Sequence, residues 1–173
     1  MSKAFTSEET PDEPALVAPR APLPAGVTNF VTARGLERLR AEQRDLHAER
    51  ARVEALDEGD ARTRALVVWA QRVAELEQRL AGATLVDAAA QPRHEVRFGA
   101  RVAVRGADGR ERRYQIVGVD EAEPAAGRIA FISPLARALL GLAVGDSAVV
   151  RTPRGDEELE VCAIEYDVAV HPS

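Results

Sequence analysis

Two apolar repeats at helical spacing, separated by a single acidic turn, constrain the fold of this chain more than any other feature of its sequence. In the second repeat the apolar residues alternate by three and four positions: Leu66, Trp69, Val73, Leu76, Leu80 and Ala83. In the first repeat they fall on one stripe in which Gln43 and Arg50 fill two heptad positions: Leu36, Leu39, Leu46 and Val53. Such spacing is typical of two helices that pack along a common seam.

The stretch between the repeats reads DEGD and predicts a reversal of the chain. Gly59 can adopt the left-handed conformation that ends a helix, and Asp60 can accept hydrogen bonds from the free amides that begin the next one. Thr32 is a candidate N-cap of the first helix. We predict an antiparallel coiled-coil hairpin over residues 30–87 with its tip at 57–60. Arms of about 23 to 25 residues would hold that tip on the order of 35 Å from the base.

The first 28 residues are rich in proline and predict a disordered tail. Prolines stand at positions 11, 14, 19, 22 and 24, and four acids are grouped around the first two: Glu8, Glu9, Asp12 and Glu13. Proline removes a backbone donor and fixes φ, so neither a helix nor a sheet ladder can run through the segment. A solvated extension is the simplest interpretation, with a partner-binding tail as the alternative.

Beyond a linker that contains Pro92, the apolar period shortens to that of a strand. Five segments show β-branched or aromatic alternation between turn residues: 96–104, 110–119, 128–133, 147–153 and 158–166. Ala107-Asp108-Gly109 is a hairpin signal between the first two. Ser133 can cap one short helix, with Pro134 at its first position. The pattern predicts a small antiparallel sheet with one short helix, an α+β domain over residues 95–167.

Composition excludes several classes of protein. The net charge of −5 argues against a protein that coats duplex DNA, because phosphate binding needs a clustered positive surface. The single cysteine, Cys162, rules out an internal disulfide and a multi-cysteine metal site, and is expected as a buried or half-buried filler on a strand. No apolar run has the length of a membrane span, and no signal pattern is present. We expect a cytoplasmic monomer with no membrane partner and no intrinsic metal.

The segment ISPLARALLGLAVGDSAVVRTPRGDEELEVCAIEY resembles the C-terminal signature of the Gre family of bacterial transcription elongation factors. In that family a Ser-Pro-Leu/Met-x-x-Ala-Leu-Leu helix is followed by Val-Gly-Asp, a strand, Thr-Pro-x-Gly and a last strand that ends Ile-Glu-Tyr. Each of these elements is present here. VTARGLERLRAE is similar to the start of the family's hairpin, Thr-x-x-Gly-x-x-x-Leu. The likeness covers about residues 30 to 167.

The resemblance implies a hairpin followed by an FKBP-like domain without isomerase activity. In the family this domain docks at the rim of the RNA polymerase secondary channel, which implies docking roles for Ser133, Pro134 and Arg137. The hairpin enters the channel, close to the nascent RNA. Acids at its tip help to hold a Mg²⁺ ion shared with the polymerase, because a weakly bound second metal needs extra carboxylate. The polymerase itself then hydrolyses backtracked RNA, so the chain is not expected to be an enzyme.

The hairpin tip departs from the family pattern Gly-Asp-x-x-Glu-Asn. Gly59 and Asp60 match the first pair, but Thr63 and Arg64 occupy the positions of the glutamate and the asparagine. A guanidinium beside the tip opposes a bound dication. Each arm is also roughly one heptad shorter than the family norm, a deficit of about 10 Å at helical rise.

Two further acids lie just before the turn. Asp57 and Glu58 could replace the missing carboxylate if the loop brought them close to Asp60. The sequence therefore predicts a polymerase-binding factor that regulates elongation or pausing, with stimulated cleavage of backtracked RNA in doubt.

Three alternatives stay open at this point. The arms are of intermediate length, which keeps a short-hairpin regulator of the type named for effects on nucleoside diphosphate kinase, or a competitive inhibitor of Gre factors. An FKBP-like isomerase ranks lower, because only seven aromatic residues are present to line a proline pocket.

A run of arginines marks the second half of the chain: Arg93, Arg97, Arg101, Arg105, Arg110, Arg112 and Arg113. A solvated sheet face is the default interpretation, with contact to polymerase or nucleic acid as the alternative.

Overall fold

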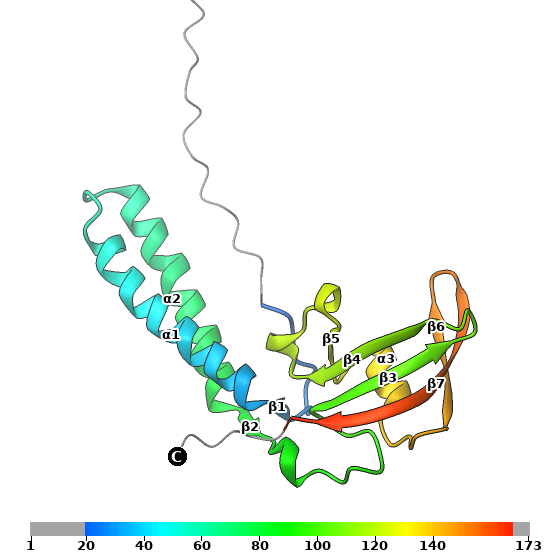
Figure 1. The fold of residues 1–173 in the computed structure, drawn as a ribbon. Helices are drawn as coiled ribbons and strands as arrows, with labels where there is room; N and C mark the ends of the chain where they lie inside the picture. The colour runs from blue at the N-terminus through cyan, green and yellow to red at the C-terminus, as the bar shows by residue number, and fades with distance from the viewer. Residues whose placement is uncertain (1–19, 168–173) are drawn as a thin grey trace, which may run out of the picture.

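The computed structural model describes residues 20–167, and residues 1–19 and 168–173 lie outside the described part. Two helices of equal length, α1 (Ala33–Glu54) and α2 (Asp60–Ala81), form a hairpin. A curled sheet with one short helix forms a second part, which meets the hairpin at its root while the tip projects away (Figure 1). The predicted hairpin followed by an α+β domain is confirmed.

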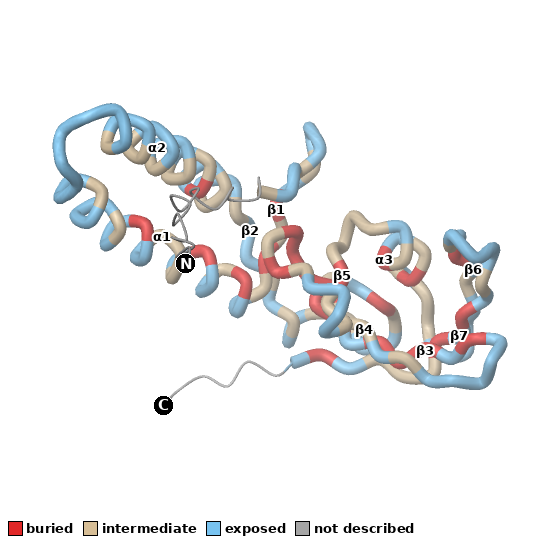
Figure 2. The backbone as a smooth tube through the Cα atoms, turned by 90° about the horizontal axis from the view of Figure 1, so that it is seen from above, coloured by how far each residue is buried: buried red, intermediate tan, exposed pale blue. Residues whose placement is uncertain are grey.

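The seam of the hairpin follows the predicted stripe. Thr32 caps α1, because its Oγ1 accepts a hydrogen bond from the backbone N–H of Gly35 at 2.9 Å. The buried apolar side chains of the hairpin extend from its root to just past the middle of α1: Val31, Leu39, Leu46 and Leu76. Towards the tip the chain is exposed (Figure 2). Among the described residues, no helix is both long enough and apolar enough to cross a bilayer.

The turn at the tip differs from the prediction in its capping. α1 ends at Glu54, and the N–H of Ala55 donates to Ala51 O at 3.1 Å, which closes the helix without a glycine. Gly59 is the N-cap residue of α2, with a nearly extended backbone (φ 158°, ψ −172°), and Asp60 is the first helical residue and caps nothing. The predicted roles of both residues are therefore wrong. α1 ends at Glu54, well before Gly59, and α2 already includes Asp60, so Asp60 is not in the capping position.

Two short strands that the sequence patterns did not predict tie the ends of the hairpin together. β1 (Asn29–Val31) and β2 (Ala83–Leu85) pair in parallel at the root. Because β1 precedes α1 and β2 follows α2, this pairing fixes both arms at their base.

The second part is a five-stranded sheet in the order β5-β4-β3-β7-β6. Its strands are β3 (Ala100–Gly106), β4 (Glu111–Val117), β5 (Arg128–Ala130), β6 (Ser147–Thr152) and β7 (Gly155–Tyr166). Three of the pairs are antiparallel as predicted, but β5 lies parallel to β4. The sheet is therefore mixed. The connection before β5 runs through the 3-10 turns η2 (Val119–Glu121) and η3 (Pro124–Ala126) and crosses over, which a simple hairpin cannot do.

One face of the sheet carries the core and the other is open. Val102 and Val104 of β3 pack with the helix α3 (Pro134–Leu139), whereas Arg101 and Arg105 alternate with them and are exposed. The period of two along a strand produces this separation.

The proline-rich segment divides at residue 20. For residues 1–19, the predicted disordered tail lies outside the described part. Residues 20–28 lie against the root of the hairpin and form a groove with the last turns of α2. The guanidinium of Arg79 donates to the carbonyl of Ala21 at 2.5 Å, and this contact helps to hold the segment despite its prolines.

A carboxylate of the sheet part joins three separate segments at the hairpin root. Asp120, 8% exposed, accepts from Arg20 at 2.7 Å and lies 3.3 Å from Nε of Arg79 on α2. Arg20 donates to Asp120 through Nη1 of its guanidinium, and through Nη2 it donates to Glu42 on α1. These two hydrogen bonds and charges raise the pKa of Arg20 although its burial acts in the opposite direction. We call Arg20, Glu42, Arg79 and Asp120 the root network.

Two further sets of contacts stabilise the same junction. Glu121, 2% exposed, accepts a hydrogen bond from the hydroxyl of Thr32, the residue that caps α1. The rings of Phe30, Phe98 and Phe131 pack with centroids 5.6 to 5.8 Å apart. Edge-to-face packing of this kind adds to the burial of apolar area. The hairpin is thus held by charge, by hydrogen bonds and by packing.

We expect Asp120→Ala to lower the free energy of unfolding by about 3 kcal/mol, because it leaves the largely buried Arg20 and Arg79 without their shared carboxylate. Urea unfolding followed by circular dichroism measures the change. Asp156→Ala is the matched control, since Asp156 forms only a 3.9 Å pair with Arg151, whose side chain is 93% exposed. The control should change stability by less than about 0.5 kcal/mol. Equal losses in the two variants would contradict a structural role for the root network.

Candidate functional site at the hairpin tip

The predicted tip acids lie where α1 turns into α2, and all of them are exposed. Asp57 and Glu58 belong to the turn, and Asp60 occupies the first position of α2. The carboxylate of Asp60 is favoured there by the helix dipole, whereas the other two follow the end of α1, where negative charge is disfavoured. Glu58 lies 3.9 Å from the guanidinium of Arg62.

The structure does not bring these acids together as a set of metal ligands. Within residues 20–167, no group of three or more Asp, Glu, His or Cys side chains is placed to hold a metal ion. Thr63, at the family's glutamate position, donates its hydroxyl to the carbonyl of Gly59 at 3.1 Å. Arg64, at the asparagine position, is exposed. The side chains present at the tip therefore do not fit a Mg²⁺ site by themselves.

The tip is carried by a stiff support. Each helix has 22 residues, which corresponds to an arm of about 33 Å. Above the buried root, the indole N–H of Trp69 donates to the carbonyl of Leu46 at 2.8 Å, and Arg50 lies over the ring at 5.3 Å. Nη1 of Arg72 donates to both carboxylate oxygens of Glu49 at 2.9 Å. These contacts between the arms continue the seam beyond the last fully buried leucine.

The predicted docking residues lie on the sheet part, away from the tip (Figure 1). Ser133 caps α3 by accepting from the N–H of Ala136 at 3.2 Å, and Pro134 is its first residue. Both therefore have structural roles of their own. Arg137 points outward from α3 and is exposed, while Ala136 and Leu139 face the core. The structure thus separates the tip from α3.

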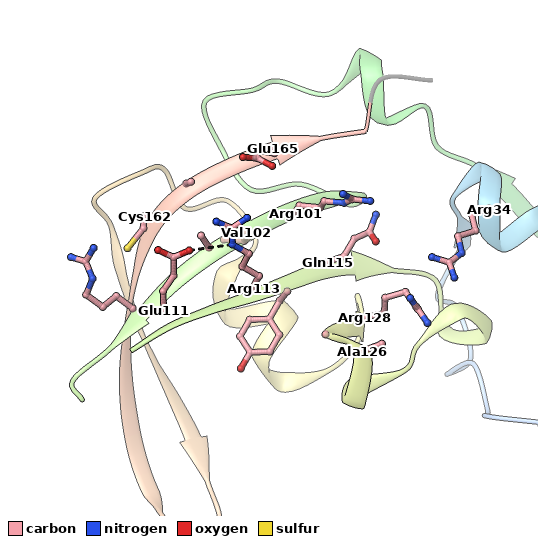
Figure 3. A pocket seen from close by; sticks show the side chains of 15 residues that line it. Arg34, Arg101, Val102, Glu111, Arg113, Gln115, Ala126, Arg128, Cys162 and Glu165 are labelled. Atoms are coloured by element: carbon pink, nitrogen blue, oxygen red, sulfur yellow. Dashed lines mark hydrogen bonds and ion pairs between the residues drawn. The ribbon is translucent and has the colours of Figure 1, made fainter. Parts of the chain in front are cut away.

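The open face of the sheet forms a third candidate site, a cavity of about 580 Å³. Five arginines from α1, β3, β4 and β5 line it: Arg34, Arg101, Arg105, Arg113 and Arg128. Glu111 and Glu165 lie among them, and Cys162 lies at one side (Figure 3). We call this cavity the arginine trough.

The sequence analysis identified only some of the arginines that line the trough. Three of the seven arginines noted in the sequence line it, and the strand period explains why neighbours such as Arg112, which contacts Glu157 at 2.5 Å, do not. Arg34 and Arg128 were missed, because one belongs to the hairpin and the other to the parallel strand. Cys162 is half-buried, as predicted.

Comparisons with known proteins identify the family. The model of the domain described as "Transcription elongation factor, GreA/GreB, C-term" matches residues 91–166. Transcription elongation factor GreA of Halorhodospira halophila is 39% identical over 153 residues, which cover 79% of this chain and 97% of that protein. The chain belongs to the Gre family of transcription elongation factors. The alternatives of an isomerase or a short-hairpin kinase regulator are not favoured by these relatives.

Other relatives match over a shorter stretch of the chain or with lower sequence identity. Transcription elongation factor GreB of Neisseria meningitidis is 42% identical over 97 residues, 56% of this chain and 60% of that protein's length. Among solved structures, GreA factor homolog 1 (Gfh1) of Thermus thermophilus is 24% identical, with a TM-score of 0.37, over 80% of this chain and 99% of that one. The GreA/GreB factor from Nitrosomonas europaea is 22% identical, with a TM-score of 0.41, over 81% and 99%.

We expect Trp69→Ala to lower the free energy of unfolding by about 3 kcal/mol, because it removes a large ring from the seam and the hydrogen bond from the indole to Leu46 on α1. Hydrogen exchange of the amides between residues 44 and 72 should accelerate more than exchange in the sheet. Val67→Ala on the same helix, at a residue that is 64% exposed, serves as control and should leave both measurements unchanged. Uniform acceleration across both parts would contradict a local role of Trp69.

Proposed function

We propose that this Gre-family chain binds RNA polymerase and presents its hairpin to the secondary channel. The sheet part acts as the anchor and α1 with α2 act as the probe. The observation that supports this division is the junction: a root network with side chains 8 to 39% exposed fixes a projecting hairpin to a separate compact body. In this proposal the polymerase catalyses RNA hydrolysis, and the chain acts only as its factor.

We further propose that the bound factor regulates elongation or pausing and stimulates RNA cleavage weakly. A dication at the tip would meet Asp60 but no second carboxylate at the family's position, where Thr63 is engaged with Gly59 O. Arg62 and Arg64 add positive charge beside it, and unit charges a few ångströms apart interact by about 1 kcal/mol even in water. Both effects weaken binding of a second metal, which the cleavage reaction needs.

Restoring the family's tip should turn cleavage on. We expect Thr63→Glu/Arg64→Asn to raise the rate of cleavage in a backtracked complex by about tenfold over wild type, which corresponds to about 1.4 kcal/mol of added transition-state stabilisation. Thr63→Gln/Arg64→Asn is the matched control, because it supplies the same shape without the carboxylate. The rate is read from the shortening of end-labelled RNA at fixed Mg²⁺.

The native acids provide the opposing test in the same assay. Asp60→Ala and Asp57→Ala/Glu58→Ala should have little effect on a wild type that cleaves weakly. Strong cleavage by wild type that disappears in the Asp57→Ala/Glu58→Ala variant would overturn the proposal, since it would show that the turn acids converge in the complex.

Docking through α3 makes a separate prediction. We expect Arg137→Glu to weaken binding to core polymerase by about tenfold, because an exposed arginine at an interface rim contributes through charge complementarity. Arg151→Glu reverses an exposed arginine on β6 and serves as control for the change in net charge. Dissociation constants from fluorescence anisotropy of a labelled factor give the comparison. Equal weakening by both substitutions would indicate non-specific electrostatics rather than docking through α3.

A further inference from the structure

The arginine trough is an exposed, arginine-rich surface that the proposed function does not use. Its walls carry five arginines against two glutamates, and its floor includes the small side chains of Ala103 and Ala163. α3 packs against the core on the opposite face of the sheet, and three arginines of the trough are exposed: Arg101, Arg105 and Arg113. A floor of alanines between arginine walls gives space for an extended chain segment.

Four of the five arginines have a carboxylate neighbour. Three of these pairs use arginine side chains that are more than half exposed, and exposed pairs are weak: Arg34 with Glu121 at 3.8 Å, Arg101 with Asp167 at 3.0 Å, and Arg113 with Glu111 at 3.2 Å. The fourth, Arg128, pairs with Glu123 and is largely buried. Within the described part of the chain, Arg105 forms no ion pair. A surface of this kind attracts carboxylates, and the attraction is screened by salt because the side chains are exposed.

The chain also carries a segment of complementary charge. Residues 1–19 contain four acids, Glu8, Glu9, Asp12 and Glu13, and their single basic side chain, Lys3, is the only lysine of the protein. Four carboxylates can pair with the arginines while the one ammonium pairs with Glu111 or Glu165. Nucleic acid offers no cation for these glutamates, and Tyr114, the only aromatic residue at the trough, packs against the core and is not free to stack on a base.

The attachment point of this segment lies close to the trough. Arg20 is bound to Asp120, and the adjacent Glu121 contacts Arg34 of the trough wall. Seven residues separate Glu13 from Arg20 and span at most about 25 Å when extended. A tether of that length gives an effective concentration on the order of millimolar, so weak pairing is enough for occupancy.

We propose that the acidic segment around residues 8–13 docks in the arginine trough of its own chain and shields it from other acidic partners. The inference is independent of polymerase binding. The reactivity of the Cys162 thiol can report whether the trough is occupied. Cys162 is the single cysteine of the protein, is half-buried and lines the trough.

The test compares the full-length chain with its Glu8→Gln/Glu9→Gln/Asp12→Asn/Glu13→Gln variant. We expect a small neutral maleimide to alkylate Cys162 about threefold more slowly in wild type at low salt, and at equal rates in 1 M salt, where the Debye length is about 3 Å. Arg105→Glu should remove the protection, and Arg151→Glu, which lies outside the trough, should preserve it. Rate profiles over pH separate shielding from any change in the thiol's ionisation.

A carbodiimide cross-link supplies a second measurement, because the protein has one lysine. We expect a bond between Lys3 and Glu111 or Glu165 in monomer-sized protein, identified by mass spectrometry. Equal alkylation of wild type and the neutralised variant at low salt, or the absence of that bond, would overturn the proposal. A bond found only in dimer-sized protein would assign the trough to a second copy, and protection of Cys162 by an added oligonucleotide alone would assign it to nucleic acid. Either result would also refute docking within one chain.

Discussion

The shared carboxylate of Asp120 joins the hairpin to the sheet part, and the direction in which the hairpin projects depends on this junction. It binds Arg20 before the hairpin and contacts Arg79 at the far end of α2, while the neighbouring Glu121 accepts from the cap of α1. An arm of about 33 Å multiplies any error at its base: a rotation of 10° at the root would move the tip by about 6 Å. A probe that must reach a defined point in a partner therefore needs a root that is both charged and packed.

The distribution of buried residues along the hairpin agrees with that requirement. The buried leucines of the seam extend from the root to Leu46, just past the middle of α1, where the indole of Trp69 and the ion pair between Arg72 and Glu49 also join the arms. Polar contacts that are partly exposed contribute less stability than buried apolar area. The tip is consequently the part of the hairpin with the least local stability, which allows its side chains to adjust when they meet a partner.

The sequence predicted the fold well wherever periodicity carried the information. The heptad stripe located both helices, and the alternation of Val102 and Val104 with Arg101 and Arg105 located a strand with one open face. The β1–β2 pairing was missed because strands of three residues are too short to show a period. The parallel strand β5 was predicted as a strand but not in its direction, since direction depends on a crossover that local pattern does not encode.

The site was less predictable than the fold for a similar reason. The identities of Asp57, Glu58 and Asp60 are plain in the sequence, but their capping depends on where α1 ends, and it ends at Glu54 through ordinary backbone bonds. The arginine trough combines residues from the hairpin, four strands and a crossover, so no single stretch of sequence predicts it.

These two surfaces show how charge is divided in a chain whose net charge is only −5. At the tip, arginines lie next to acids and reduce the field that a dication would feel, whereas on the sheet face arginines gather with fewer acids between them. A metal at the tip would therefore need ligands from the partner as well as from this chain. In the proposed complex with RNA polymerase, the chemistry would therefore depend mainly on the polymerase, with this protein contributing a stiff arm.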